Sequence, residues 1–78
     1  MIEELERVVL TADVPQYHLT AGDIGTVVDI SNDGEEYTVE FLTLDGETVA
    51  VLPVLRGNIR RISRGEIAHV RAIDLVVI

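Results

Sequence analysis

The sequence predicts a small all-β domain, a five-stranded antiparallel barrel that is only partly closed. The chain has 78 residues, 47% of them hydrophobic, so there is room for a single core. The only aromatic residues are Tyr17, Tyr37 and Phe41. The core must therefore be built from valine, isoleucine and leucine, and the β-branched members of that set favour strands. Short apolar runs separated by glycine, proline, asparagine and aspartate complete the pattern of a small β protein.

The first two strands are predicted on either side of a long loop. Residues 7–12 form the first strand, and residues 13–22, with Pro15 and Gly22, form an ordered loop. Residues 23–31 form the second strand, in which Gly25 predicts a bulge or a sharp bend of the sheet. The Asn-Asp-Gly sequence at 32–34 predicts a turn into the third strand.

The clearest local signal is the Asp45-Gly46 pair between two strand-like runs. It predicts a two-residue type I′ turn. That turn fixes a register in which Phe41 faces Ala50 and Leu42 faces Val49. One face of the hairpin then forms the predicted core, which comprises Tyr37, Val39, Phe41, Ala50, Leu52 and Val54.

The remainder of the chain predicts a closing strand and an extension. Pro53 predicts that the fourth strand ends there or lies at an edge. Residues 55–59 predict a turn or 3₁₀ segment, and residues 59–62 a short closing strand. Ser63 and Glu66 have capping-box spacing, which predicts a short helix over 64–71, while the β-branched residues 73–78 predict an additional strand. We therefore predict one domain over 1–78, with its barrel at 5–62 and an extension at 63–78.

The charge is strongly acidic and unevenly distributed. The net charge is −8, and all six basic residues are arginines. Residues 1–55 hold one arginine and 12 acidic residues, whereas residues 56–78 hold five arginines and two acidic residues. This asymmetry favours ion pairs between the two parts of the chain, with self-association or a partner site at the basic end as alternatives. The basic cluster that the last alternative uses is Arg56, Arg60, Arg61 and Arg64.

No set of catalytic, cofactor-binding or metal-binding residues stands out, so we expect a protein that is not an enzyme. The chain has no cysteine, which excludes disulfides, thiolate metal ligands and a cysteine nucleophile. His18 and His69 lack ligand spacing, and the acidic group at Asp33, Glu35 and Glu36 is expected to be solvated. With neither a signal-peptide pattern nor a long apolar run, we expect a cytoplasmic location and no membrane contact.

Two segments carry a resemblance to known families. Residues 21–28, AGDIGTVV, followed by YTVEF at 37–41, resemble the SH3-like barrels of KOW-type domains and of the nitrile hydratase β-subunit. Residues 6–15, 41–51 and 67–71 together resemble a family of short bacterial proteins described only as a domain of unknown function. The resemblance implies a small SH3-like barrel, brings no catalytic residues, and implies a gene located beside small toxin or nuclease genes.

The predicted function is protein binding. In the predicted register, four aliphatic side chains lie on the face opposite Phe41, and an exposed patch of this kind marks a partner surface or is covered by the chain's own end. We expect self-association, an antitoxin-like or accessory role towards a neighbouring gene product, and a preference for basic partners. The alternative is a KOW-like nucleic-acid-binding domain, which the net negative charge disfavours. The predicted partner-binding residues are Leu42, Leu44, Val49, Val51, Ile73, Leu75 and Val77.

Overall fold

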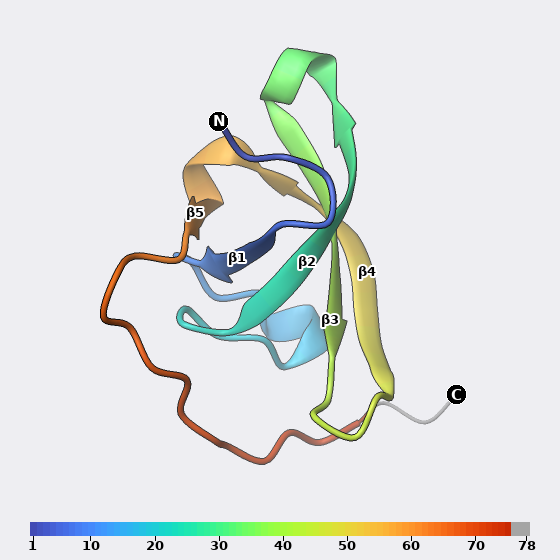
Figure 1. Cartoon of the computed structure of the whole chain (residues 1–78). Helices are drawn as coiled ribbons and strands as arrows, with labels where there is room; N and C mark the ends of the chain where they lie inside the picture. Colours follow the sequence, from blue (N-terminus) through green and yellow to red (C-terminus); the bar gives the residue numbers. More distant parts are fainter. Residues whose placement is uncertain (76–78) are drawn as a thin grey trace.

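The computed structural model describes residues 1–75, and these contain five strands in one antiparallel sheet (Figure 1). The sheet order is β4-β3-β2-β1-β5, so the last strand returns to pair with the first. This confirms the predicted all-β class and strand number. The strands are β1 (Arg7–Leu10), β2 (Ile24–Ser31), β3 (Glu36–Leu42), β4 (Thr48–Leu55) and β5 (Ile59–Arg61), and short 3₁₀ turns lie at η1 (Pro15–Tyr17), η2 (Asn32–Gly34) and η3 (Arg56–Asn58).

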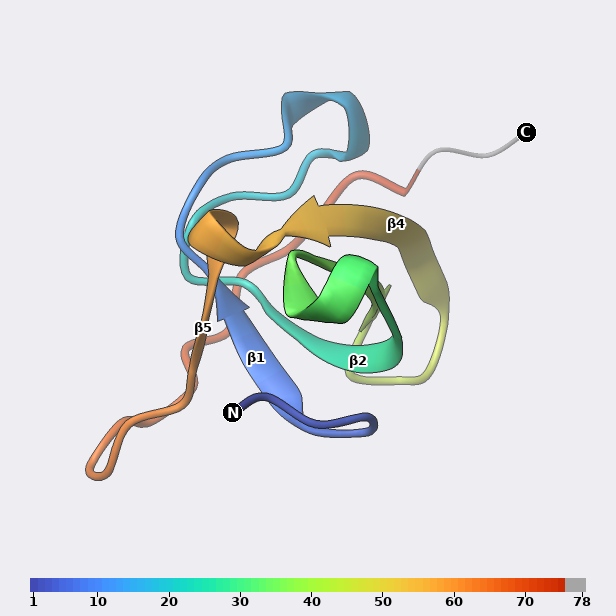
Figure 2. The same cartoon turned by 90° about the horizontal axis from the view of Figure 1, so that it is seen from above.

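The sheet curls into a partly open barrel. Viewed from above, β1, β2, β4 and β5 are arranged in a ring around the turn at η2, which is green in this view (Figure 2). β4 and β5 remain the two edges of the sheet, because within residues 1–75 no ladder joins them and η3 makes the corner between them. The fold therefore has free strand edges, in agreement with the prediction of a barrel that is only partly closed.

The core fills the inside of this curl. All six side chains predicted for the hairpin's inner face are buried, with Val39 and Phe41 at its centre. Strand alternation explains the result, since successive side chains point to opposite faces and β3 and β4 each direct every second residue inward. The other strands and the long loop add Val8, Leu10, Leu19, Val27 and Ile59.

Gly25 and the bulge of β2 are separate features, so of the bulge or sharp bend predicted at Gly25 the bulge is wrong. The register shift lies between Val27 and Asp29, which leaves Val28 as the extra residue. Gly25 has a different role. A Cβ built on Gly25 would lie 2.5 Å from Val39 Cγ1 and 2.8 Å from Phe41 Cε1, so no other residue fits without displacing core side chains.

The turn between β3 and β4 is longer than predicted. Gly46 N–H donates to Thr43 O at 3.0 Å and Thr43 N–H to Glu47 O at 2.8 Å, which encloses three residues between Thr43 and Glu47. Gly46 has a φ of +94°, typical of a type I turn followed by a left-handed residue. The two-residue prediction is therefore wrong at the tip, whereas the pairing of Phe41 with Ala50 is confirmed.

β4 continues through Pro53 to Leu55 because its free edge tolerates proline. Arg56 N–H donates to Glu35 O at 3.0 Å. In an antiparallel pair, residues that form hydrogen bonds to the neighbouring strand alternate with residues that do not, so every second residue back from Arg56 bonds to β3. The residues of β4 whose side chains point inward therefore direct their backbone groups towards β3. Val51, Pro53 and Leu55 direct theirs away from the sheet, so the missing N–H of Pro53 costs no ladder hydrogen bond. The prediction that Pro53 lies at an edge is confirmed.

The helix predicted over 64–71 is wrong. Ser63 N–H donates to Glu66 Oε1 at 2.5 Å, so half of the capping box is present. Gly65 then takes a left-handed φ of +84°, and residues 66–75 run on without regular structure. In Figure 1 this segment passes below the long loop towards the β3–β4 turn. The additional strand predicted at 73–78 is absent over 73–75, and residues 76–78 lie outside the described part.

Candidate functional site

An aliphatic patch lies on the outer face of the β3–β4 hairpin. Val51 and Leu55 point outward from β4 and are 53% and 60% exposed. Leu42 points outward from β3 at 48% exposure, and Leu44 at the turn is 91% exposed. We call these four residues the aliphatic patch. It contains three of the predicted partner-binding residues, and Leu55 is a member that the sequence reasoning missed because it placed Leu55 in a turn.

A row of polar and acidic side chains runs beside the patch. Glu40 is the cross-strand neighbour of Val51, and Glu36 that of Leu55. Both glutamates are partly exposed, and neither takes part in an ion pair within residues 1–75. The face thus presents aliphatic side chains next to unneutralised carboxylates. This arrangement can bury apolar surface and attract positive charge at the same time.

Val49 does not belong to this patch, contrary to the sequence prediction. Leu42 faces Thr48 rather than Val49, because the three-residue turn shifts the register by one residue between Phe41 and Leu42. Val49 is left as the extra residue of β4 at this point. It is partly buried and packs against the core.

The carboxyl-terminal candidates divide into three cases. Ile73 packs against the core of its own chain, whereas the alternative considered from the sequence had the extension cover the outward aliphatic residues, which stay exposed. Leu75 is 38% exposed at the end of the described part. Val77 lies outside the described residues.

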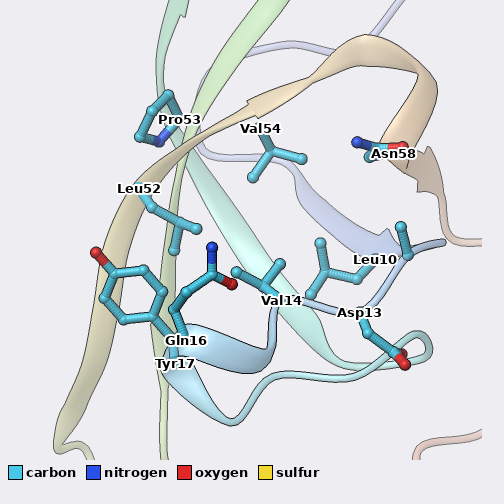
Figure 3. Close-up of a pocket in the computed structure, with 10 residues that line it drawn as sticks. Leu10, Asp13, Val14, Gln16, Tyr17, Leu52, Pro53, Val54 and Asn58 are labelled. Carbon is cyan, nitrogen blue, oxygen red and sulfur yellow. The ribbon is translucent and has the colours of Figure 1, made fainter.

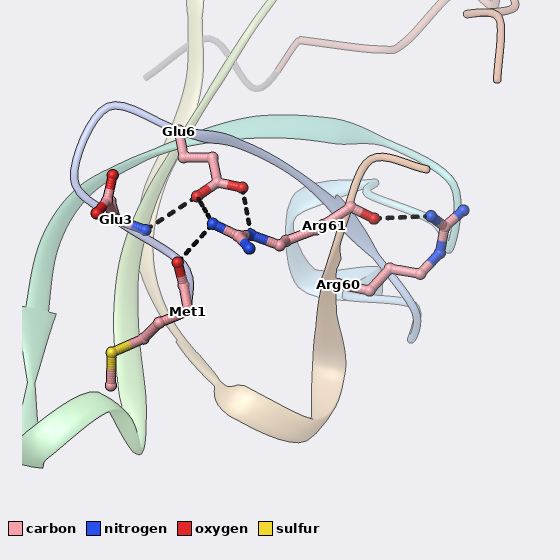
Figure 4. A network of polar contacts seen from close by, with 5 residues as sticks. All are labelled: Met1, Glu3, Glu6, Arg60 and Arg61. Carbon is pink, nitrogen blue, oxygen red and sulfur yellow. Dashed lines mark hydrogen bonds and ion pairs between the residues drawn. The ribbon is translucent and has the colours of Figure 1, made fainter. Parts of the chain in front are cut away.

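Most arginines of the basic cluster are engaged in ion pairs. Arg61 donates from Nε to Glu6 Oε2 at 2.7 Å and from Nη2 to Met1 O at 2.5 Å, which ties β5 to the amino terminus (Figure 4). Arg56 pairs with Glu35 at 3.3 Å. These pairs join the acidic and basic parts of the chain, as the charge asymmetry predicts. The guanidinium of Arg61 lowers the pKa of the Glu6 carboxyl.

The third paired arginine closes a turn within the basic end itself. Arg60 makes a two-point contact with Glu66, at 2.8 and 2.6 Å. This contact and the Ser63 N–H lower the pKa of Glu66 to about 2. Arg64 is exposed on the same turn and forms no ion pair within residues 1–75. Three of the four cluster arginines are thus neutralised locally, which leaves little free positive charge for a polyanion.

A shallow groove of about 330 Å³ lies between the long loop and β4 (Figure 3). Its lining includes the apolar side chain of Leu52, the ring of Tyr17 and the side-chain amides of Gln16 and Asn58. Asp13 also lines it, but Asp13 Oδ1 already accepts the Ala21 N–H at 2.8 Å. The full lining is Leu10, Ala12, Asp13, Val14, Gln16, Tyr17, Leu52, Pro53, Val54 and Asn58.

Within residues 1–75, no group of three histidine, aspartate or glutamate side chains comes together in a way that would hold a metal ion. In the same residues there is no helix with the length and apolar character needed to traverse a membrane. The expectations of no cofactor and of a cytoplasmic location remain predictions.

The comparison with protein families supports the predicted resemblance. The family model described as a domain of unknown function, DUF4926, matches residues 4–61. This range contains all five strands and ends before the extended segment at 66–75. Neither the curated proteins nor the solved structures contain a significant match. The chain belongs to the DUF4926 family.

Proposed function

We propose that this protein is a non-enzymatic protein-binding module that holds a basic partner on the aliphatic patch. The observation that carries the proposal is the pairing of exposed aliphatic residues on β4 with unneutralised glutamates on β3, seen at Val51 with Glu40 and at Leu55 with Glu36. Aliphatic contact supplies affinity, because full burial of one valine or leucine side chain contributes about 1.5–3 kcal/mol. The carboxylates supply selectivity and faster encounter with a positively charged surface.

The charge of the chain favours a basic partner over a second copy at this patch. Each copy carries a net charge of −8. A symmetric contact through the patch would bring Glu36 and Glu40 of one copy towards the same residues of the other. Like charges that meet at an interface oppose binding, whereas lysine and arginine of a basic protein would neutralise this row.

The family resemblance supplies the first partner to test, the product of the adjacent gene. A neutralising or accessory role towards a basic toxin or nuclease is consistent with the acidic surface. We propose to measure binding of the two purified proteins by isothermal titration calorimetry. Leu44→Asp combined with Val51→Asp should weaken binding at least about tenfold, the equivalent of 1.4 kcal/mol.

Ile67→Asp is the matched control, because Ile67 is 95% exposed and lies outside the patch. It should leave the affinity unchanged. Equal affinity of the double variant and the wild type would refute a role for the patch. A salt-dependent complex with RNA or DNA, abolished by Arg60→Ala with Arg61→Ala, would replace the proposal with the nucleic-acid function.

A further inference from the structure

Residues 67–75 are held to the rest of the protein by side chains and not by a backbone ladder. The last backbone hydrogen bond before them runs from Glu66 N–H to Ser63 O at 3.3 Å, and within residues 1–75 no backbone pair joins 67–75 to the sheet. The segment is mostly exposed, with Val70 at 73%. Two of its side chains contact the barrel: Arg71 forms an ion pair with Asp23, and Ile73 packs against the core.

Arg71 binds the Asp23 carboxylate and the His18 carbonyl, and other contacts within the barrel hold Asp23 in position. Its Nε donates to Asp23 Oδ1 at 2.9 Å, its Nη2 donates to Asp23 Oδ2, and Nη2 also donates to His18 O at 3.1 Å. Asp23 is positioned without the segment, because its Oδ2 accepts the Thr20 N–H at 2.8 Å.

The backbone of Asp23 is fixed as well. Its carbonyl accepts the Leu10 N–H at 2.9 Å, and its own N–H donates to Thr20 O at 3.0 Å. The loop and the start of β2 thus present a fixed carboxylate beside a carbonyl oxygen. Planar, two-point contacts of this kind are the geometry in which arginine binds most selectively.

We propose that this end of the barrel is a binding site for an extended Arg-x-Ile segment, which residues 71–73 fill within one chain and which the same residues of a second copy can fill by exchange. The contacts are identical in both cases, so exchange costs only the loss of the covalent tether. Such a tether corresponds to an effective concentration on the order of millimolar. Residues 67–70, between Glu66 and Arg71, are exposed and make no backbone hydrogen bond within residues 1–75, so the chain can change direction there.

The proposal does not depend on the aliphatic patch, since the exchanged contacts involve Asp23, His18 and the core instead. It also assigns a second copy to a different surface from the basic partner. The Arg71–Asp23 ion pair is partly shielded, with side-chain exposures of 38% and 18%, so it discriminates against like charge more strongly than a fully exposed pair.

A charge-reversal experiment tests the exchange. Asp23→Arg alone and Arg71→Asp alone each place like charges at the site, so each should release its own segment and remain monomeric. Mixed in equal amounts, the two variants can restore both ion pairs only by exchanging segments. Light scattering in the high micromolar range should then show a heterodimer. Exclusively monomeric mixtures would overturn the proposal.

A second measurement covers the case in which Asp23→Arg fails to fold, since Asp23 also accepts the Thr20 N–H. The full-length Arg71→Asp variant leaves Asp23 and the His18 carbonyl unchanged. It should bind a synthetic peptide of residues 66–78, whereas the same peptide with Arg71→Asp should not bind. No binding of the first peptide would also overturn the proposal. The peptide could bind the Arg71→Asp variant while the two charge-reversed variants, both folded, form no heterodimer. That result would overturn exchange and assign the site to a segment of another protein.

The two proposals can fail separately. The Leu44→Asp, Val51→Asp variant leaves Asp23, Arg71 and Ile73 unchanged. It should lose the basic partner and still exchange segments. Loss of exchange in this variant, with the fold intact, would show that the second copy binds at the patch and would refute the assignment made here.

Discussion

Gly25 and Val39 lie in such close contact that the space for a Cβ on Gly25 is already taken by Val39 Cγ1, 2.5 Å away. Gly25→Ala must displace a core side chain, and overpacking of this kind costs about 1–3 kcal/mol in the free energy of unfolding. Urea denaturation would measure the loss. Gly57→Ala is the control, because nothing lies within 4 Å of a Cβ built there, and its effect should stay within about 0.5 kcal/mol. Equal stability of both variants would contradict the close approach.

Val49 and Val51 should respond differently to the same substitution. Val49 packs against the core, so Val49→Asp should lower the free energy of unfolding by about 1–3 kcal/mol. Val51 points outward and faces Glu40, so Val51→Asp should lower it by a smaller amount, about 0.5–1 kcal/mol, through lost strand propensity and like-charge repulsion. Thermal or urea unfolding of the two variants checks the register shift directly. If Val51→Asp were the less stable of the two variants, the result would support the two-residue turn instead.

The Thr43 hydroxyl fixes the β3–β4 turn. Its oxygen accepts the Glu47 N–H at 2.9 Å, and it lies 2.5 Å from Asp45 Oδ1, to which it donates. Thr43→Ala should cost about 0.5–1.5 kcal/mol. Thr43→Ser keeps the hydroxyl and should recover most of that loss. If Thr43→Ser is as unstable as Thr43→Ala, the methyl group and not the hydrogen bonds would be responsible.

Glu66 should titrate well below an ordinary glutamate. Hydrogen bonds from Arg60 and from Ser63 N–H lower its pKa from 4.5 to about 2. Because the pKa in the folded state is lowered, the stabilisation is complete above pH 4.5 and is lost as the pH falls towards 2. An NMR titration of the Glu66 carboxyl would show the midpoint, and Arg60→Gln should raise it. A midpoint near 4.5 in the wild type would contradict the two-point contact.

Local pattern was sufficient to predict most of the barrel. Alternation of apolar residues placed Val39 and Phe41 in the core correctly, because strand side chains repeat every two residues whatever the surroundings. Local pattern failed where a single residue changes the geometry. One extra residue in the turn moved Val49 to the core side, and the left-handed Gly65 prevented the helix that Ser63 and Glu66 predicted.

The candidate sites were harder to predict because they depend on contacts between distant residues. Leu55 joined the patch only because β4 continues past Pro53, and that depends on β4 being an edge of the sheet. The contact between Arg71 and Asp23 spans 48 residues and follows from the path of the extended segment. Charge asymmetry predicted that the two parts of the chain would pair, but it could not identify the partners.

The position of Pro53 also affects how copies of the protein behave when crowded. β4 has no charged side chain to repel another strand, and apolar edges of this kind template fibril growth. A foreign strand that added there would face a proline nitrogen in the middle of the row, with no proton to donate and a bulky ring in the way. Fibrillar stacking along β4 is therefore interrupted at Pro53, and the apolar edge is kept without becoming a seed for aggregation.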